Sequence, residues 1–329
     1  MLLQYILRRI AYMALILVAV SIVSFIIIQL PPGDYLTTYI LTLKEAGHEV
    51  DEAQIAALEK RYGLDKPPVM QYLWWVWNML HGDFGRSFEW NLPVLELVME
   101  RLPLTVILSL STLLFTYAVA IPIGIYSATH QYSIGDFMAT IFGFIGLAVP
   151  NFLFALILMW VLYSAFGLSI GGLFSQEYLQ AEWSWPKFVD LLKHLPVPLL
   201  VIGMAGTAGL IRVMRGSLLD ELRKQYVVTA RAKGVSEGRL LFKYPVRIAL
   251  NPLISSVGWA LPAIVSGSTI ASIVLNLPTT GPLLFRALVS QDMYLAGSSV
   301  MFLTFLTVIG ILISDILLAV LDPRIRYTK

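Results

Sequence analysis

The chain contains no cysteine, which excludes disulfides, thiol chemistry and cysteine-ligated metals. Its histidines lie far apart and form no metal-binding spacing; they are His48, His81, His130 and His194. The chain also lacks a glycine-rich loop ending in Gly-Lys-Ser or Gly-Lys-Thr, and it lacks a His-Glu-x-x-His motif. We therefore expect a protein that is not an enzyme, with no catalytic residue, no metal and no cofactor of its own.

Charged residues are scarce, at 13% of the 329 residues, whereas hydrophobic residues make up 57%. Soluble globular proteins carry roughly 25% charged residues, so this composition is typical of an integral membrane protein. The net charge of +2 argues neither for nor against an acidic partner, and no feature of the chain favours a nucleic acid.

Long apolar runs are abundant. A membrane-spanning helix needs about 20 apolar residues, and six segments qualify: roughly residues 10–30, 102–128, 137–166, 195–213, 248–275 and 300–321. The fourth is the weakest because it is short and glycine-rich, and the fifth is interrupted by Pro252, Gly258 and Pro262. The fold class predicted is an all-α polytopic membrane protein with six transmembrane helices. The first segment is not followed by a small-residue cleavage site, so we expect a span and not a signal peptide.

The distribution of charge predicts the orientation. Most of the 23 Lys and Arg lie at the two termini and between Arg212 and Arg247, whereas most acidic residues lie in the other loops. Because basic loops stay in the cytoplasm, both termini are expected there. The predicted organisation is 1–30 (N-terminus and first span), 31–101 (external loop or subdomain) and 102–329 (transmembrane core), the last including a cytoplasmic loop at 214–247.

The first external loop contains two expected helices. Asp51 and Gln54 have the spacing of a capping box, and Gly63 would end that helix. The second, residues 69–80, contains one tyrosine and three tryptophans, Tyr72, Trp74, Trp75 and Trp77. It is interpreted first as an interfacial helix at the lipid headgroups, and alternatively as a contact surface for a binding protein or a sugar substrate.

Polar residues within the spans are few. Asp315 is the one clear intramembrane charge, and we interpret it as a structural buried pair, with Arg324 or Arg326 as its partner, in preference to a proton relay. Five softer positions could line a transport pathway or could join helices through hydrogen bonds. These candidate pathway residues are Asn151, Ser255, Ser266, Thr269 and Asn276; Ser256 and Ser268 belong to the same polar set.

The cytoplasmic loop predicts two short helices around a glycine. Leu219, Leu222, Tyr226 and Ala230 recur at spacings of three and four, which places them on one helical face. Gly234 is expected to end the first helix in a left-handed conformation. Ser236 would cap the second helix. A loop that only set the topology would not need this pattern, so it indicates a docking surface.

A resemblance becomes specific at this loop. Residues 226–234, Tyr-Val-Val-Thr-Ala-Arg-Ala-Lys-Gly, closely resemble the cytoplasmic signature of the dipeptide/oligopeptide/nickel class of binding-protein-dependent ABC importer permeases. Further segments resemble that family in the same order; they are residues 5–9, 32–34, 61–65, 82–85, 101–105, 215–219 and 321–327. The long first external loop resembles that of the B-type subunit.

The resemblance implies a fold, a location and partners. The fold would be the type I ABC importer permease fold, in a bacterial or archaeal cytoplasmic (inner) membrane. The partners would be a C-type permease, two ABC ATPases that bind ATP and magnesium, and an extracytoplasmic binding protein. Residues 226–237 would form the coupling helix region that docks on an ATPase, with packing from Tyr226, Ala230 and Val235, charge from Arg231, Lys233 and Glu237, and a turn at Gly234.

The segment 277–284, Leu-Pro-Thr-Thr-Gly-Pro-Leu-Leu, departs from the aromatic-Pro-Gly-Leu-Gly type more common in peptide permeases. The cargo therefore stays open among oligopeptides, oligosaccharides, opines and nickel. Two other classes also stay open, an ion-coupled secondary transporter and a membrane scaffold or receptor. The first would usually show internal repeats and several intramembrane carboxylates, and neither is evident.

Overall fold

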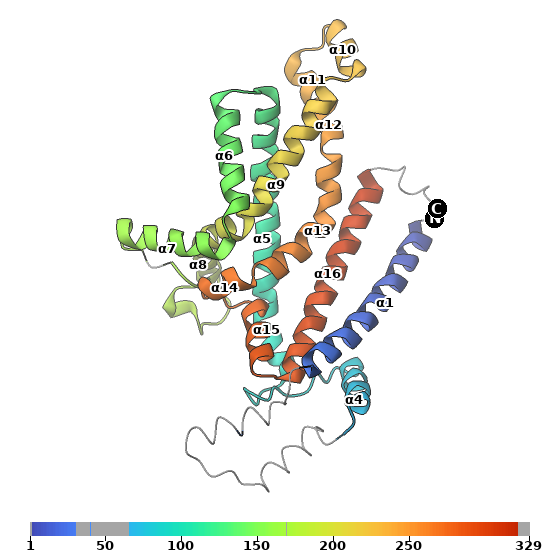
Figure 1. The fold of residues 1–329 in the computed structure, drawn as a ribbon, viewed down its shortest axis with the longest axis vertical. Coiled ribbons are helices and arrows are strands. Elements are labelled where there is room, and N and C mark those ends of the chain that lie inside the picture. Colours follow the sequence, from blue (N-terminus) through green and yellow to red (C-terminus); the bar gives the residue numbers. More distant parts are fainter. Residues whose placement is uncertain (1, 31–39, 41–65, 169, 322–329) are drawn as a thin grey trace. The chain divides into compact units, whose positions relative to one another are not determined.

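The computed structural model describes residues 2–30, 40, 66–168 and 170–321, and helices dominate this part of the chain (Figure 1). Within it the only strand-like pairing is an isolated antiparallel bridge between Arg86 and Pro93. The chain divides into two compact units, residues 1–104 with 279–308 and residues 105–278 with 309–329. The helix predicted after Asp51 lies outside the described residues, and the predicted domain boundaries stay predictions.

The first unit combines the two ends of the sequence. It contains α1 (Leu2–Gln29), α4 (Pro68–Leu80), α15 (Thr280–Val289) and the first turns of α5 (Val94–Thr129) and α16 (Met293–Leu321). Its main core is formed by Val94, Leu97, Val98, Leu283, Ala287, Leu295 and Ala296. A second cluster holds α4 in place and is formed by Phe25, Trp75, Phe88 and Met293.

A buried carboxylate organises the loop of the first unit that precedes α5. Asp292 is fully buried just before α16, and it accepts hydrogen bonds from Ser87 Oγ at 2.5 Å and from the Phe88 N–H at 2.7 Å. It also accepts from the N–H groups of Glu89 and Leu295. Burial raises the pKa of Asp292, although these hydrogen bonds favour its charged form.

The second unit is built around α9 (Pro196–Leu222), which contacts α6 (Ile134–Ala148), α7 (Asn151–Phe166), α8 (Trp185–His194), α12 (Pro245–Ala249), α13 (Asn251–Gly267) and α14 (Thr269–Val274). A 3₁₀ turn, Gln176–Tyr178, precedes α8. The core is formed by Ala128, Met214, Leu218, Val246, Ala249 and Leu253. Helix α9 is therefore the central helix of this unit.

The spans agree only partly with the six predicted. Four described helices are long and apolar enough to cross a membrane, namely α1, α5, α9 and α16. Helices α6 and α7 form a fifth only if they are counted together, because they bend by 110° at Pro150; proline removes a backbone donor and disfavours a helical residue before it. The predicted fifth span is divided between α13 and α14 at Ser268. The all-α polytopic class is confirmed, and the count of six stays a prediction.

Candidate functional site

The loop predicted to be cytoplasmic forms a helix, a glycine turn and a second helix, as predicted. Helix α10 (Gln225–Ala232) follows α9 after two residues, and α11 (Glu237–Lys243) follows α10 (Figure 1). Gly234 has φ of +77°, the left-handed conformation expected at this stop. Its N–H donates to the Arg231 carbonyl at 3.0 Å, and the Val235 N–H donates to the Ala230 carbonyl at 3.3 Å. We call residues 225–243 the elbow.

The exposed side of the elbow carries several charged residues, two of which form an ion pair. Arg231 Nε donates to Glu237 Oε1 at 2.6 Å, and a second guanidinium nitrogen donates to Oε2 at 3.0 Å. This paired hydrogen bond lowers the pKa of Glu237 and raises that of Arg231. The bond spans the turn at Gly234, so it joins the end of α10 to the start of α11.

The buried side of the elbow differs from the face expected from spacing. Leu219 and Leu222 lie on α9, whereas Tyr226 and Ala230 lie on α10, so the break between the helices divides the expected face. The buried residue of α10 is Val227. Tyr226 instead donates to Glu221 at 2.6 Å, and burial together with this carboxylate raises its pKa. Ser236 precedes α11, but its hydroxyl makes no capping hydrogen bond.

An ion pair joins Arg215, in the part of α9 that leads to the elbow, to Asp136 in the first turn of α6. The Arg215 guanidinium donates two hydrogen bonds of 2.9 Å to Asp136, one to each carboxylate oxygen. Asp136 also accepts from the Tyr132 N–H at 2.9 Å and from the Ser127 hydroxyl. Its side chain is 5% exposed. Four donors therefore satisfy this carboxylate and join the turn between α5 and α6 to α9. The sequence offered no signal for this pairing between residues 79 apart.

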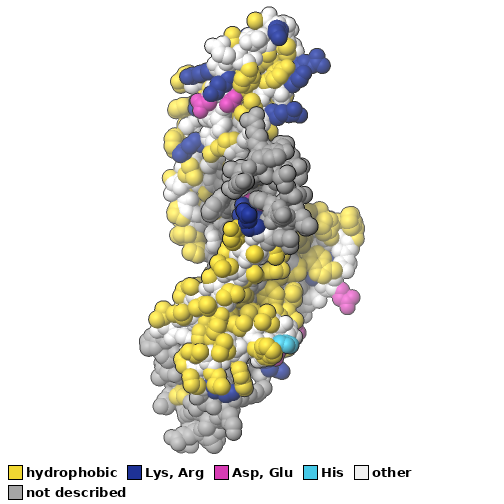
Figure 2. Space-filling model, turned by 90° about the vertical axis from the view of Figure 1, so that its right-hand side faces the viewer, with side chains coloured by type: hydrophobic (Ala, Val, Ile, Leu, Met, Phe, Trp, Pro, Cys, Tyr) yellow, Lys and Arg dark blue, Asp and Glu magenta, His cyan; other side chains and the backbone are white. Residues whose placement is uncertain are grey.

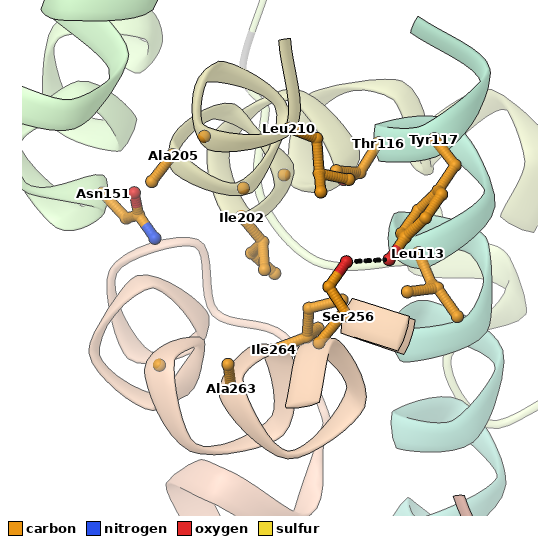
Figure 3. Close-up of a pocket in the computed structure, with 15 residues that line it drawn as sticks. Leu113, Thr116, Tyr117, Asn151, Ile202, Ala205, Leu210, Ser256, Ala263 and Ile264 are labelled. Atoms are coloured by element: carbon orange, nitrogen blue, oxygen red, sulfur yellow. Dashed lines mark hydrogen bonds between the residues drawn. The ribbon is translucent and has the colours of Figure 1, made fainter. Parts of the chain in front are cut away.

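The second unit also contains a cavity of about 370 Å³, which lies between α5, α9 and α13 (Figure 3). Three small residues of α9, Gly203, Gly206 and Gly209, lie along its wall and leave space for it. Tyr117 Oη lies 2.8 Å from Ser256 Oγ and donates to the Leu253 carbonyl at 3.0 Å. The cavity is thus mainly apolar, with polar groups at a few points.

The predicted pathway residues are not brought together. Asn151 lines the cavity, and Figure 3 shows its amide across from Tyr117 and Ser256. Ser255 is exposed and donates to the Asn251 carbonyl, while its neighbour Ser256 is the serine that faces the cavity. The other three, Ser266, Thr269 and Asn276, are absent from the cavity lining. The sequence signal for this cavity is the glycine spacing in the fourth predicted span, Gly203, Gly206 and Gly209.

Two further predicted features are placed only in part. Asp315 lies in α16, but Arg324 and Arg326, its expected partners, lie outside the described residues. Among the described residues no group of three or more acidic, cysteine or histidine side chains could hold a metal ion. The structural role of Asp315 and the expected absence of a metal therefore stay predictions.

Comparisons with known proteins identify the family. Residues 120–327 match the family described as "Binding-protein-dependent transport system inner membrane component", and residues 2–110 match the N-terminal region of such membrane components. The chain belongs to this family. The resemblance to the B-type ABC importer permeases is therefore confirmed over almost the whole sequence.

Several full-length relatives of this permease carry transport names. It is 38% identical to the oligopeptide transport system permease protein AppB of Bacillus subtilis, over 98% of this chain and 99% of the relative. It is 31% identical to the peptidoglycan transport system permease protein YejB of Agrobacterium fabrum, over 99% and 98%. It is 30% identical to the inner membrane ABC transporter permease protein YejB of Escherichia coli O157:H7, over 98% of each. The chain is thus a multi-pass inner membrane permease component.

Proposed function

We propose that this permease forms half of a translocation path and that the elbow couples it to an ATPase. The observation that carries the proposal is the left-handed turn at Gly234, which holds α10 and α11 at an angle and leaves Arg231, Lys233 and Gly234 exposed. A family whose transport depends on other components needs such a docking surface, since this chain has no nucleotide-binding loop of its own.

Because this chain is proposed to supply only part of the transport path, the remaining functions are assigned to partner proteins. A second, C-type permease would complete the path, and two ABC ATPases would bind and hydrolyse ATP with magnesium. An extracytoplasmic binding protein would deliver the cargo on the opposite side, with both termini of this chain in the cytoplasm. The exposed Arg231, Lys233 and Glu237 would give the ATPase contact its charge complementarity, while Tyr226, Ala230 and Val235 are half-buried and would contribute packing.

A physical connection supports transmission from the elbow to the path. Helix α9 ends just before the elbow, bears Arg215 near that end, and lines the cavity with Gly203 and Gly206 further along. The hydrogen bonds from Arg215 to Asp136 hold α9 to the first turn of α6. When ATP closes the ATPases, a displaced elbow would therefore move α9 and α6 together and change the cavity walls.

The cargo proposed is an oligopeptide. AppB is named for oligopeptide transport, and three further relatives at 31% identity are named as peptide permeases. Because one relative is named for peptidoglycan transport, peptides linked to sugars should be tested as cargo as well. Residues 277–284, which depart from the common peptide-permease pattern, would be one place to seek selectivity.

Copurification and uptake test the proposal together. The chain would be expressed with its genomic neighbours, purified, and assayed for an associated ATPase and for uptake of peptides, sugar-linked peptides and oligosaccharides. We expect a stable ATPase complex and uptake that stops when ATP is depleted. Uptake that persists without ATP and stops when the proton gradient is collapsed would instead establish the ion-coupled alternative.

A single-cysteine crosslink tests the docking surface itself. The chain has no cysteine, so Lys233→Cys supplies a unique thiol on the elbow. We expect Lys233→Cys to crosslink to the ATPase. Tyr132→Cys, which is 87% exposed on the turn between α5 and α6, is the control and should crosslink less. Crosslinking at Tyr132→Cys and not at Lys233→Cys would refute the proposed docking surface.

A further inference from the structure

Helix α4 has two faces, and both are apolar. One face packs within the first unit through Tyr72, Trp75, Val76 and Met79. The other is exposed at spacings of four, four and three residues: Val69 is 71% exposed, Leu73 58%, Trp77 64% and Leu80 75%. None of the 13 residues of α4 is charged. A water-facing surface helix would carry charged residues on this outer face, so water is a poor solvent for it.

The contacts of α4 define its depth along the first span. Trp75 stacks on Phe25 with ring centroids 6.4 Å apart, and Tyr72 Oη lies 2.9 Å from Ser21 Oγ. Gln71 accepts a hydrogen bond of 3.1 Å from Gln29, where the span of α1 ends. At about 1.5 Å per helical residue, Phe25 lies roughly 6 Å and Ser21 roughly 12 Å below that end. Helix α4 therefore packs against the last turns of a membrane span.

Helix α1, against which α4 packs, also has an exposed apolar surface near its end. The residues of α1 at the same level are exposed and apolar; they are Ile22, Val23, Ile26 and Ile27. Figure 2, which views the side bearing α1 and α4, shows hydrophobic side chains gathered over the region of these two helices. Lys66 lies just before α4 with its Nζ 3.1 Å from the centre of the Trp74 ring. An apolar surface with aromatic residues and a flanking lysine is typical of the membrane–water interface.

We propose that α4 is an interfacial anchor, with lipid covering the face of Leu73, Trp77 and Leu80. It lies in the leaflet where α1 ends, at the boundary between acyl chains and headgroups. Tryptophan suits this boundary because its ring is apolar and its N–H is polar. The proposal does not depend on the ATPase contact or on the cargo. A second permease on this face is the competing occupant, and the test distinguishes it from lipid.

Spin labels test what covers α4. Because the chain has no cysteine, Leu73→Cys, Trp77→Cys and Leu80→Cys each give one labelling site in this subunit. Leu15→Cys, 69% exposed in the middle of α1, is the lipid control, and the exposed Glu177→Cys is the water control. The complex with its partner subunits, without binding protein, would be placed in lipid nanodiscs. Collision of each label with oxygen and with a water-soluble nickel chelate would then be measured.

We expect oxygen to relax the labels on α4 more than the nickel chelate does, with a depth between the two controls. Labels that behave like the one at Glu177 would overturn the proposal in favour of a water-exposed face. Labels shielded from both reagents would overturn it in favour of a protein partner. Three positions are used so that one variant that fails to assemble does not decide the result, and a retained copurifying ATPase confirms assembly.

Discussion

Helix α4 and the elbow are both largely exposed, yet the chemistry of their surfaces is opposite. Helix α4 has no charged residue and presents Leu73 and Trp77, whereas the elbow presents Arg231, Lys233 and Glu237 around a glycine turn. The contrast teaches that exposure in a single chain of a membrane complex does not by itself indicate water. The composition of the exposed face indicates which solvent or partner it meets.

The two helices are also anchored in different ways. Helix α4 is anchored by burial of Trp75, which is 3% exposed. The Trp75 ring packs so closely on Gly297 that a Cβ added at Gly297 would lie 2.9 Å from it. The helix that precedes the elbow is anchored by the bidentate pair of Arg215 and Asp136. Packing anchors the apolar helix, and charge-assisted hydrogen bonds anchor the region next to the polar one.

The largest effect is expected from Gly234→Val. A β-branched residue at φ +77° is strained by more than the roughly 1–2 kcal/mol of an ordinary residue. No atom lies within 4 Å of an added Cβ, so the change acts on the backbone turn and not on packing. We expect uptake to be lost while membrane insertion is kept, measured by transport in vesicles and by copurification of the ATPase.

Gly238→Val is the matched control for that change. Gly238 lies in α11, also has no atom within 4 Å of an added Cβ, and has no positive φ. The same side chain should be tolerated there. Normal uptake by Gly234→Val, or equal losses of uptake in both variants, would contradict the proposed role of the turn at Gly234.

Trp75→Ala should give the next largest effect, on the apolar side of the comparison. Removing a buried tryptophan typically costs about 3–5 kcal/mol because a cavity remains. Thermal unfolding of the purified complex in nanodiscs measures the loss. Trp77→Ala, on the exposed face, should change the unfolding temperature far less, and equal shifts would refute the assignment of the two faces.

Asp136→Asn tests the charged anchor. Breaking a buried ion pair costs about 3–5 kcal/mol when the remaining charge stays buried. Arg215 is 28% exposed, so we expect a loss below that range, accompanied by a weaker stimulation of ATP hydrolysis by cargo. Asp220→Asn, an exposed aspartate on the same helix α9, is the control and should leave both measurements unchanged.

A smaller effect should separate the two surfaces directly. Leu73→Lys on α4 and Val228→Lys on α10 place the same charge at sites that are 58% and 50% exposed. The cost of a charge falls from about 3 kcal/mol at the bilayer centre toward the interface, so Leu73→Lys should lose roughly 1 kcal/mol in nanodiscs. Val228→Lys should leave the stability of the protein in nanodiscs unchanged. Equal losses of stability in the two variants would contradict the assignment of lipid to the α4 face.

The smallest effect concerns pH and the elbow ion pair. The hydrogen bond from Arg231 lowers the pKa of Glu237, so the pair contributes above the ordinary glutamate pKa of about 4.3 and is lost only as the pH falls through the lowered value. Transport-coupled ATP hydrolysis should therefore show no step from this pair between about pH 5.5 and 8. Glu237→Gln should keep the shape of this pH profile, and it should lower the unfolding temperature only slightly, since exposed ion pairs contribute little to stability.

Local features were predicted well from the sequence. The left-handed Gly234 and the two short helices around it follow from residues within one or two turns of each other. The aromatic helix at residues 69–80 corresponds to α4, Pro68–Leu80. The membrane class and the family depend on composition and on motifs spread along the chain, and the comparisons confirmed both.

Features that depend on distant residues could not be predicted. No local pattern pairs Asp136 with Arg215, selects Ser256 over Ser255 for the cavity, or makes Val227 the buried residue of α10. The helical membrane class, the permease family and the glycine elbow follow from the sequence alone, because hydrophobicity, helix signals and backbone freedom are properties of short segments. The tertiary structure alone decided which faces are buried, where spans bend and which charges meet, because packing between segments far apart in the chain sets all three.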